Sequence, residues 1–149
     1  MKSLASAVVM SETRARLRTV RANDRARWGS MTAKQMVRHL RCSYEVALGE
    51  RTVWPLPGPP PVLMKWFALE SGLRWPKNMR TMPELKRAIR ERTEMEFDAV
   101  VEETVEKMQE LAKGVRCAPS HPMFGPMTEK DWMRWGYLHA DHHLRQFGR

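Results

Sequence analysis

Apolar residues at helical spacing run through most of this sequence, and that periodicity constrains the fold more than any other feature. The clearest example is the segment "WGSMTAKQMVRHLRCSYEVALGE", residues 28–50. Its apolar residues that recur every four positions share one face of a helix: Met36, Leu40, Tyr44 and Leu48. Thr32 is a suitable N-cap, and Gly49 is a suitable residue to end the helix. The segment therefore predicts a long amphipathic helix.

Four further segments have helical periodicity, with caps or breakers at their ends: residues 11–20, 61–73, 84–113 and the segment after Thr128. Ser11 can cap the first, while Pro61 suits the first turn of the second and Gly72 lies near its end. The third has a predicted buried stripe of Phe97, Val101, Val105, Met108 and Leu111. Thr128 is followed by acidic residues, which suit a helix N-terminus.

The connections between these segments are irregular rather than extended. Residues 53–61 contain five of the ten prolines and predict a loop or polyproline-like connector, and residues 114–126 predict another loop. Alternating strand patterns are nearly absent. We therefore predict an all-α fold, a four-helix bundle with a short extra N-terminal helix. Residues 1–10 are expected to form a mobile tail, and residues 11–149 a single domain.

The charge of the chain leaves its partners open. Twenty-six Lys and Arg against 17 Asp and Glu give a formal charge of +9, and six arginines lie between Arg14 and Arg27. Such a segment can attract nucleic acid or another anion, or it can be a solvated helix face. It lacks interleaved aromatic residues and any reading motif, so nucleic-acid binding is the weaker interpretation. Two cysteines, no clear signal peptide and no membrane-length apolar run predict a soluble cytoplasmic protein.

Three of the five histidines lie in the last predicted helix, in "YLHADHHLRQFGR". His139 and His143 are four residues apart and therefore share a helix face, the geometry that lets two imidazoles bind one cation. His142 lies about 100° away from that face, so we expect it on the exposed surface. A pair of histidines at this spacing can also be a polar patch without a ligand.

A third candidate ligand is His39 in the middle of the helix predicted from residue 32. Its stripe also contains Gln35, one turn earlier, and it is predicted to face the core. A buried histidine without a partner is costly, whereas a metal ion satisfies a neutral imidazole. Two helices that contribute His39, His139 and His143 would form a three-nitrogen site with an open position, as catalytic metal sites have.

Other residues can reach this predicted site: Gln35, Cys42, His121, His142 and Gln146. Cys42 follows His39 by three residues and is either a fourth ligand or a small buried apolar residue, the second being favoured. His121 in "HPMFG" is expected to shape a loop above the site, with proton donation as the alternative. No catalytic residue is assigned.

Two motifs together resemble the DinB/YfiT-like superfamily. "WGSMTAKQMVRHL" and, far downstream, "HPMFGPMTEKDWMRWGYLHADHHLRQFG" are similar to those of an uncharacterised branch with a W-G-x-M-[ST]-x-x-Q-M-x-x-H start. The resemblance covers roughly residues 27–148 and implies a four-helix bundle of up-down-down-up connectivity, often a homodimer. It implies a divalent metal bound by His39, His139 and His143. The superfamily's usual Arg-Gly-Gln tail reads Leu-Arg-Gln here, so Gln146 is shifted in register.

The resemblance also implies a class of chemistry, because characterised relatives include thiol-dependent transferases and an isomerase. It predicts a metal-dependent transferase or hydrolase acting on a small substrate, with a low-molecular-weight thiol as a further cofactor. Three neutral histidines suit zinc or nickel first, with iron, cobalt or manganese as alternatives. The competing interpretation is a non-catalytic bundle that binds a metal or ligand.

Overall fold

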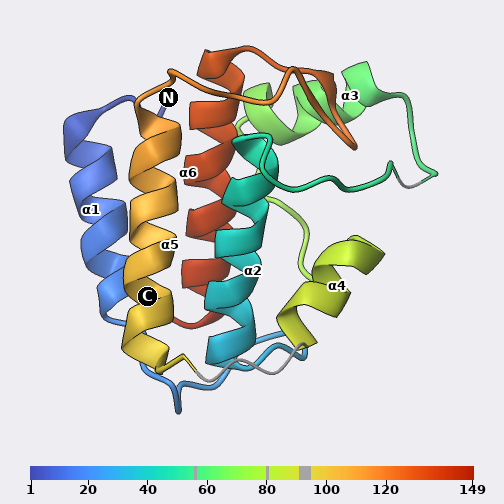
Figure 1. Cartoon of the computed structure of the whole chain (residues 1–149). Coiled ribbons are helices and arrows are strands. Elements are labelled where there is room, and N and C mark those ends of the chain that lie inside the picture. Colours follow the sequence, from blue (N-terminus) through green and yellow to red (C-terminus); the bar gives the residue numbers. More distant parts are fainter. Residues whose placement is uncertain (56, 80, 91–94) are drawn as a thin grey trace.

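The computed structural model describes residues 1–55, 57–79, 81–90 and 95–149, and in this part the chain is mostly helical (Figure 1). The described helices are α1 (Ala7–Arg18), α2 (Ala33–Ala47), α3 (Pro61–Lys65), a π-helical turn η1 (Trp66–Glu70), α4 (Pro83–Arg90), α5 (Phe97–Ala112) and α6 (Glu129–Gln146). A small antiparallel pair joins β1 (Ser120–His121) to β2 (Gly125–Pro126). The predicted predominance of helix is therefore confirmed.

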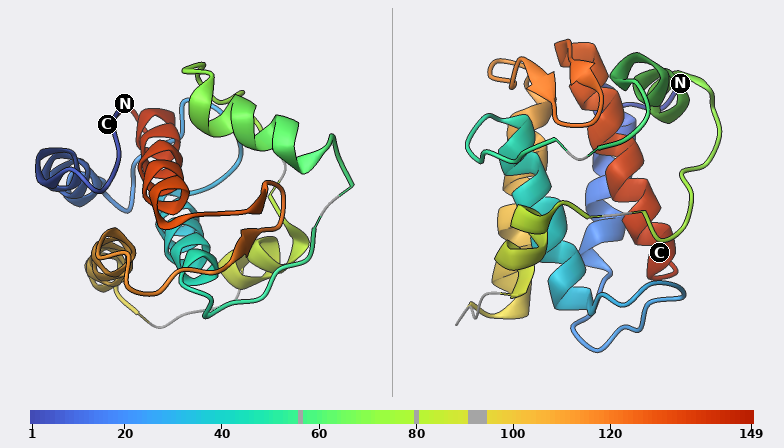
Figure 2. Two further views of the ribbon diagram at one scale, coloured as in Figure 1. Left: turned by 90° about the horizontal axis from the view of Figure 1, so that it is seen from above. Right: turned by 90° about the vertical axis from the view of Figure 1, so that its right-hand side faces the viewer.

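The four longest helices, α1, α2, α5 and α6, pack side by side around one core (Figure 1). In Figure 2, α3 and α4 both lie on the side of α2 and α6 that faces away from α1 and α5. α4 packs on α2, and η1 packs on α6. This placement brings the described residues just before α4 close to α2 and α6.

Capping boxes fix the start of the two helices that carry the histidines. Thr32 accepts the N–H of Gln35, and the Gln35 side chain accepts the N–H of Thr32. Thr128 and Asp131 make the same reciprocal pair at the start of α6. Both predicted caps are thus confirmed, and Gly49, with φ of 75°, follows the end of α2 as expected.

The core is closed by aromatic residues of α2 and α6. Trp132 is completely buried and its Nε1 donates a 2.7 Å hydrogen bond to the Ala118 carbonyl. Tyr44 packs against Trp135 and its hydroxyl donates to the Gly136 carbonyl at 3.2 Å. A Cβ at Gly136 would lie 2.8 Å from a methyl carbon of Leu4, so glycine permits this close approach. The tryptophans of α6 therefore pack in the core.

The predicted start of the first helix at Ser11 is wrong. The helix begins at Ala7, where the Ser6 hydroxyl accepts the Val9 N–H, and Leu4 is buried with its N–H bonded to Met133. Because α1 packs on α5 and α6, its apolar face extends upstream of the arginine-rich part that dominates the sequence pattern. The N-terminal helix thus belongs to the packed core of four helices and is not an addition to it.

The predicted continuous helix over residues 84–113 is also wrong. α4 is described as far as Arg90, and α5 begins at Phe97 after an extended Glu96 with ψ of 150°. Residues 91–94 of the predicted helix lie outside the described residues. Each helix buries its own apolar face, and a shared period of 3.6 residues does not reveal the break between them. The β1–β2 pair within the predicted loop was missed for a related reason, because two-residue strands are too short to show alternation.

Candidate metal centre

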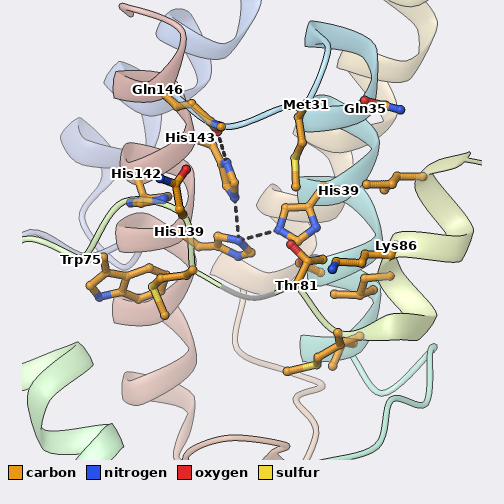
Figure 3. A pocket seen from close by; sticks show the side chains of 18 of the residues that line it. Met31, Gln35, His39, Trp75, Thr81, Lys86, His139, His142, His143 and Gln146 are labelled. Atoms are coloured by element: carbon orange, nitrogen blue, oxygen red, sulfur yellow. Dashed lines mark hydrogen bonds between the residues drawn. The ribbon is translucent and has the colours of Figure 1, made fainter. Parts of the chain in front are cut away.

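A pocket of about 640 Å³ opens between α2, α4 and α6, and the three predicted metal ligands lie in it (Figure 3). Its walls also come from the connections around residues 28–31, 75–79 and 81–82. His39 projects from α2 on one side, and His139 and His143 project from α6 on the other. Residues that are about one hundred positions apart in the sequence thus meet at a single point.

The ring nitrogens of the three histidines converge. His39 Nε2 lies 3.0 Å from His139 Nε2, which lies 3.2 Å from His143 Nε2. Two nitrogens that each bind one zinc ion at about 2.0–2.1 Å lie roughly 2.9–3.4 Å apart, depending on the bond angle. Among the described residues these three form a group of donor atoms close enough to hold one metal ion. The observed separations therefore fit ligands of a common cation.

Gln146 determines which nitrogen of His143 carries the proton. Its Nε2 donates to the Trp28 carbonyl at 2.8 Å, so its Oε1 is the atom that faces His143 Nδ1, also at 2.8 Å. An amide oxygen can only accept, so the neutral His143 ring carries its proton on Nδ1. Its Nε2 lone pair is then directed at His139 and the centre of the group. This is the tautomer that metal ligation requires.

The contact between Gln146 and the Trp28 carbonyl depends on Gly29. That residue has φ of 78°, and a Cβ there would lie 2.7 Å from Gln146 Nε2. The N–H of Arg27 also donates to the Gln146 carbonyl at 2.7 Å. Hydrogen bonds therefore hold the loop before α2 against the end of α6. Gly29 leaves room for the Gln146 amide, which orients His143.

A cation resolves a conflict that the imidazoles cannot resolve alone. Because His143 Nε2 has no proton, His139 Nε2 must donate to it or face it lone pair to lone pair. If it donates, it cannot also accept from His39 Nε2. At most one of the two short contacts can therefore be a hydrogen bond, whereas a metal ion satisfies all three lone pairs at once.

Burial keeps these histidines neutral and available as ligands. It lowers the pKa of His39 to about 4, with His142 as a smaller cause. It also lowers the pKa values of His139 and His143 well below the usual value, with neighbouring histidines as further causes. Neutral imidazole is the metal-binding form, so no proton has to be displaced from this site near neutral pH.

The expected exposure of His142 is wrong. It is 6% exposed, lines the pocket, and contacts the rings of Trp28 and Trp75, each with a centroid distance of 6.0 Å. Figure 3 shows it with Trp75 on the side of His139 and His143 that faces away from His39. The helix face that carries His142 is covered by two irregular segments, a long-range contact that helical spacing does not reveal.

The other predicted lining residues divide into those that reach the pocket and one that does not. His121 lines it, stacks on Phe124 at 4.2 Å, and accepts the Met123 N–H through Nδ1. Gln35 lines it too, although its side chain serves the α2 capping box. Cys42 does not line it and instead packs in a second apolar cluster with Val46, where burial raises the pKa of its thiol.

Among the residues of the pocket wall that sequence reasoning missed are Trp28, Trp75 and Lys86. The two tryptophans lie in irregular segments, where large aromatic residues are seldom placed without a packing partner. That signal could have marked them as part of a structured wall. Lys86 carries no comparable signal, because an exposed lysine on a short helix has no characteristic pattern.

The arginine-rich segment is partly neutralised by acidic residues of other helices. Arg16 pairs with Asp141 at 2.8 Å, and Arg18 with Glu102 at 2.6 Å. These ion pairs link α1 to α6 and α5, so part of the positive charge of the segment is used in contacts between helices.

One family model matches nearly the whole chain. Residues 9–149 match the family model of DUF1569, described as a protein of unknown function. The chain belongs to the DUF1569 family. No curated protein and no solved structure matches it. In the described part of this DUF1569 member, no helix combines the length and apolarity needed to span a bilayer.

In this DUF1569 protein, Gln146→Ala is expected to weaken divalent-metal affinity by roughly 10–100-fold, because His143 loses the partner that fixes its tautomer. The measurement is a competition titration with zinc. Gln35→Ala is the matched control, since it removes an amide that lines the same pocket but whose oxygen accepts the Thr32 N–H instead of bonding to a histidine. Equal losses of affinity in the two variants would contradict the orienting role.

Proposed function

We propose that this protein is a metal-dependent enzyme, a transferase or hydrolase that acts on a small molecule. Its metal centre consists of His39, His139 and His143, and zinc or nickel is the expected ion. The observation that carries the proposal is the convergence of three neutral Nε2 atoms in an open pocket of about 640 Å³. A purely structural metal site would be closed by four protein ligands.

The donor set supports an exchangeable position at the metal. Only three donor atoms group together in the described structure, and Cys42, the candidate fourth ligand, is directed into the second apolar cluster. When bound, the ion would lower the pKa of a water or thiol that it binds and make it a nucleophile near neutral pH. A thiol-dependent reaction stays a prediction from the DinB-like resemblance.

The chain's own residues would bind and orient the substrate. Trp75 and Trp135 flank His139, with ring centroids 5.8 and 4.9 Å away, and supply apolar walls that exclude water. Thr81 and Lys86 lie on the His39 side of the pocket (Figure 3). Lys86 supplies positive charge for a polar or anionic group near the metal centre.

His121 has a defined proton position of its own. Its Nδ1 accepts the Met123 N–H at 3.1 Å, so the neutral ring carries its proton on Nε2. Burial lowers the pKa of His121 to about 3 and keeps the ring neutral. It would therefore act as a hydrogen-bond donor to substrate through Nε2, and a role as a charged proton donor near neutral pH is disfavoured.

The DinB-like architecture belongs to the same proposal. It is supported by the directions of the helices, since α1 and α6 run opposite to α2 and α5 in Figure 1. It is also supported by the source of the ligands, one histidine from α2 and two from α6. Homodimerisation stays a prediction from the resemblance.

The function is tested by assaying metal-loaded protein for thiol addition to a chromogenic electrophile and for hydrolysis of a chromogenic ester. We expect turnover that a chelator abolishes, that zinc or nickel restores, and that His143→Ala lacks. Stoichiometric metal binding without turnover on either probe would favour the non-catalytic binding protein instead.

A further inference from the structure

We call the pocket that contains the three histidines the metal pocket. A second hollow, of about 410 Å³, adjoins it, and Trp28 and Trp75 line both. We call it the basic pocket. It is lined by five cationic side chains together with the two tryptophans and Gly148: Arg27, Arg74, Lys77, Arg145 and Arg149. No Asp or Glu is among the described residues that line it. A concave site lined by positive charges raises the local concentration of anions.

Three of the five cations keep their charge available. Arg145 pairs with Asp141 at 2.8 Å, and Arg149 pairs with Asp24. By contrast, Arg27, Arg74 and Lys77 form no ion pair with an acidic residue in the described part of the chain. A net positive charge therefore remains in the basic pocket.

Two of these cations contact neighbouring groups of the pocket wall. The Arg27 guanidinium lies against Gly148, where a Cβ would approach its Nη2 to 2.6 Å, so a side chain at this position would displace the guanidinium. The Lys77 ammonium lies 5.1 Å from the centre of the Trp28 ring, within the range of a cation–π interaction. Packing of this kind reduces the conformational entropy lost when a ligand binds.

The wall between the two pockets leads directly to the metal centre. Trp75 faces the ligand His139 at 5.8 Å, and Trp28 meets His142 edge-on at 6.0 Å. Trp28 Nε1 and His142 Nδ1 are buried and have no hydrogen-bond partner within the described residues. Unsatisfied polar atoms in such a wall are costly unless something bonds to them. Both atoms belong to side chains that line the pocket of the three histidines.

We propose that the basic pocket binds the anionic end of the substrate, a phosphate or carboxylate group, while the reactive end of the same molecule reaches the three histidines. Guanidinium groups match both oxyanions in geometry, and two indoles flank the path between the pockets. The substrate class is thus an elongated small anion. This inference rests on the proposed function, but anion binding can be tested without metal.

The test follows the indole N–H resonances of Trp28 and Trp75 in metal-free protein during titration with inorganic phosphate, at constant ionic strength. Each resonance is assigned by its Trp→Phe variant. We expect both to shift with saturation, and Arg74→Gln and Lys77→Gln each to weaken phosphate binding about tenfold. Arg87→Gln, which removes an equal charge from the exposed side of α4, is the control and should bind as the wild type does.

Each other outcome is equally decisive. Absence of saturable shifts at both indoles, or equal weakening by Arg87→Gln, would overturn the inference. Acetate at the same ionic strength distinguishes a carboxylate site from a phosphate site. If single-stranded DNA bound at the same indoles more tightly than phosphate, with a steep dependence on salt, the proposal of a small-molecule substrate would be overturned. Phosphate binding retained in His139→Ala/His143→Ala would support this inference even if the metal-centre proposal failed.

Discussion

Replacing His139 and His143 together with alanine is expected to abolish metal binding, lowering affinity by more than about a thousandfold. Two of three donor nitrogens are lost, and each loss should exceed the roughly 10–100-fold cost of removing an outer partner. The remaining nitrogen, His39 Nε2, would have no neighbouring donor among the described residues to share a cation. Elemental analysis of untagged protein and zinc competition measure the effect, with circular dichroism to verify that the variant folds.

The matched control is His142→Ala. His142 is as buried as the ligands and lies in the same helix, but its ring is directed toward the two tryptophans. Metal binding should survive this change, whereas His39→Ala should remove most of it. Equal loss in all variants would contradict the assigned ligand set. A wild-type protein that binds no zinc, nickel or manganese would contradict the centre itself.

Lowering the pH from 7 to 5 is expected to destabilise the metal-free protein by about 4 kcal/mol from His39 and His121 alone. Their pKa values in the folded state are about 4 and about 3, because both are buried. An unfolded chain protonates histidine near pH 6.5, so below that pH the unfolded state binds more protons. Stability is full above about pH 6.5 and falls by about 1.4 kcal/mol per pH unit for each residue.

Three further histidines act in the same direction, since burial lowers the pKa values of His139, His142 and His143 as well. The measurement is urea unfolding followed by tryptophan fluorescence at pH 7, 6 and 5, in the presence of a chelator. His121→Phe is expected to reduce the pH dependence by about one proton. A free energy of unfolding that is constant from pH 7 to 5 would show that these histidines are not buried in the folded protein.

Much of the helical framework follows from local sequence. Thr32 and Thr128 are suitable caps in the sequence, and the structure shows that each hydroxyl, with an acceptor three residues later, satisfies free N–H groups within one turn. The pairing of His139 with His143 is equally local, because four residues bring side chains onto one helix face. Break points were not predicted where two helices share a period, as between α4 and α5, and a cap further upstream, at Ser6, was overlooked.

What the sequence by itself determined is therefore the predominance of helix, the caps of α2 and α6, and the shared face of the two candidate ligands in α6, because these depend on contacts within a turn or two. Only the tertiary structure decided the meeting of His39 with that pair, the burial of His142 and the orientation of His143 by Gln146. It also placed Trp28 and Trp75 between the metal pocket and the basic pocket. These features arise from packing between segments far apart in the chain, and such contacts leave no periodic trace in the order of residues.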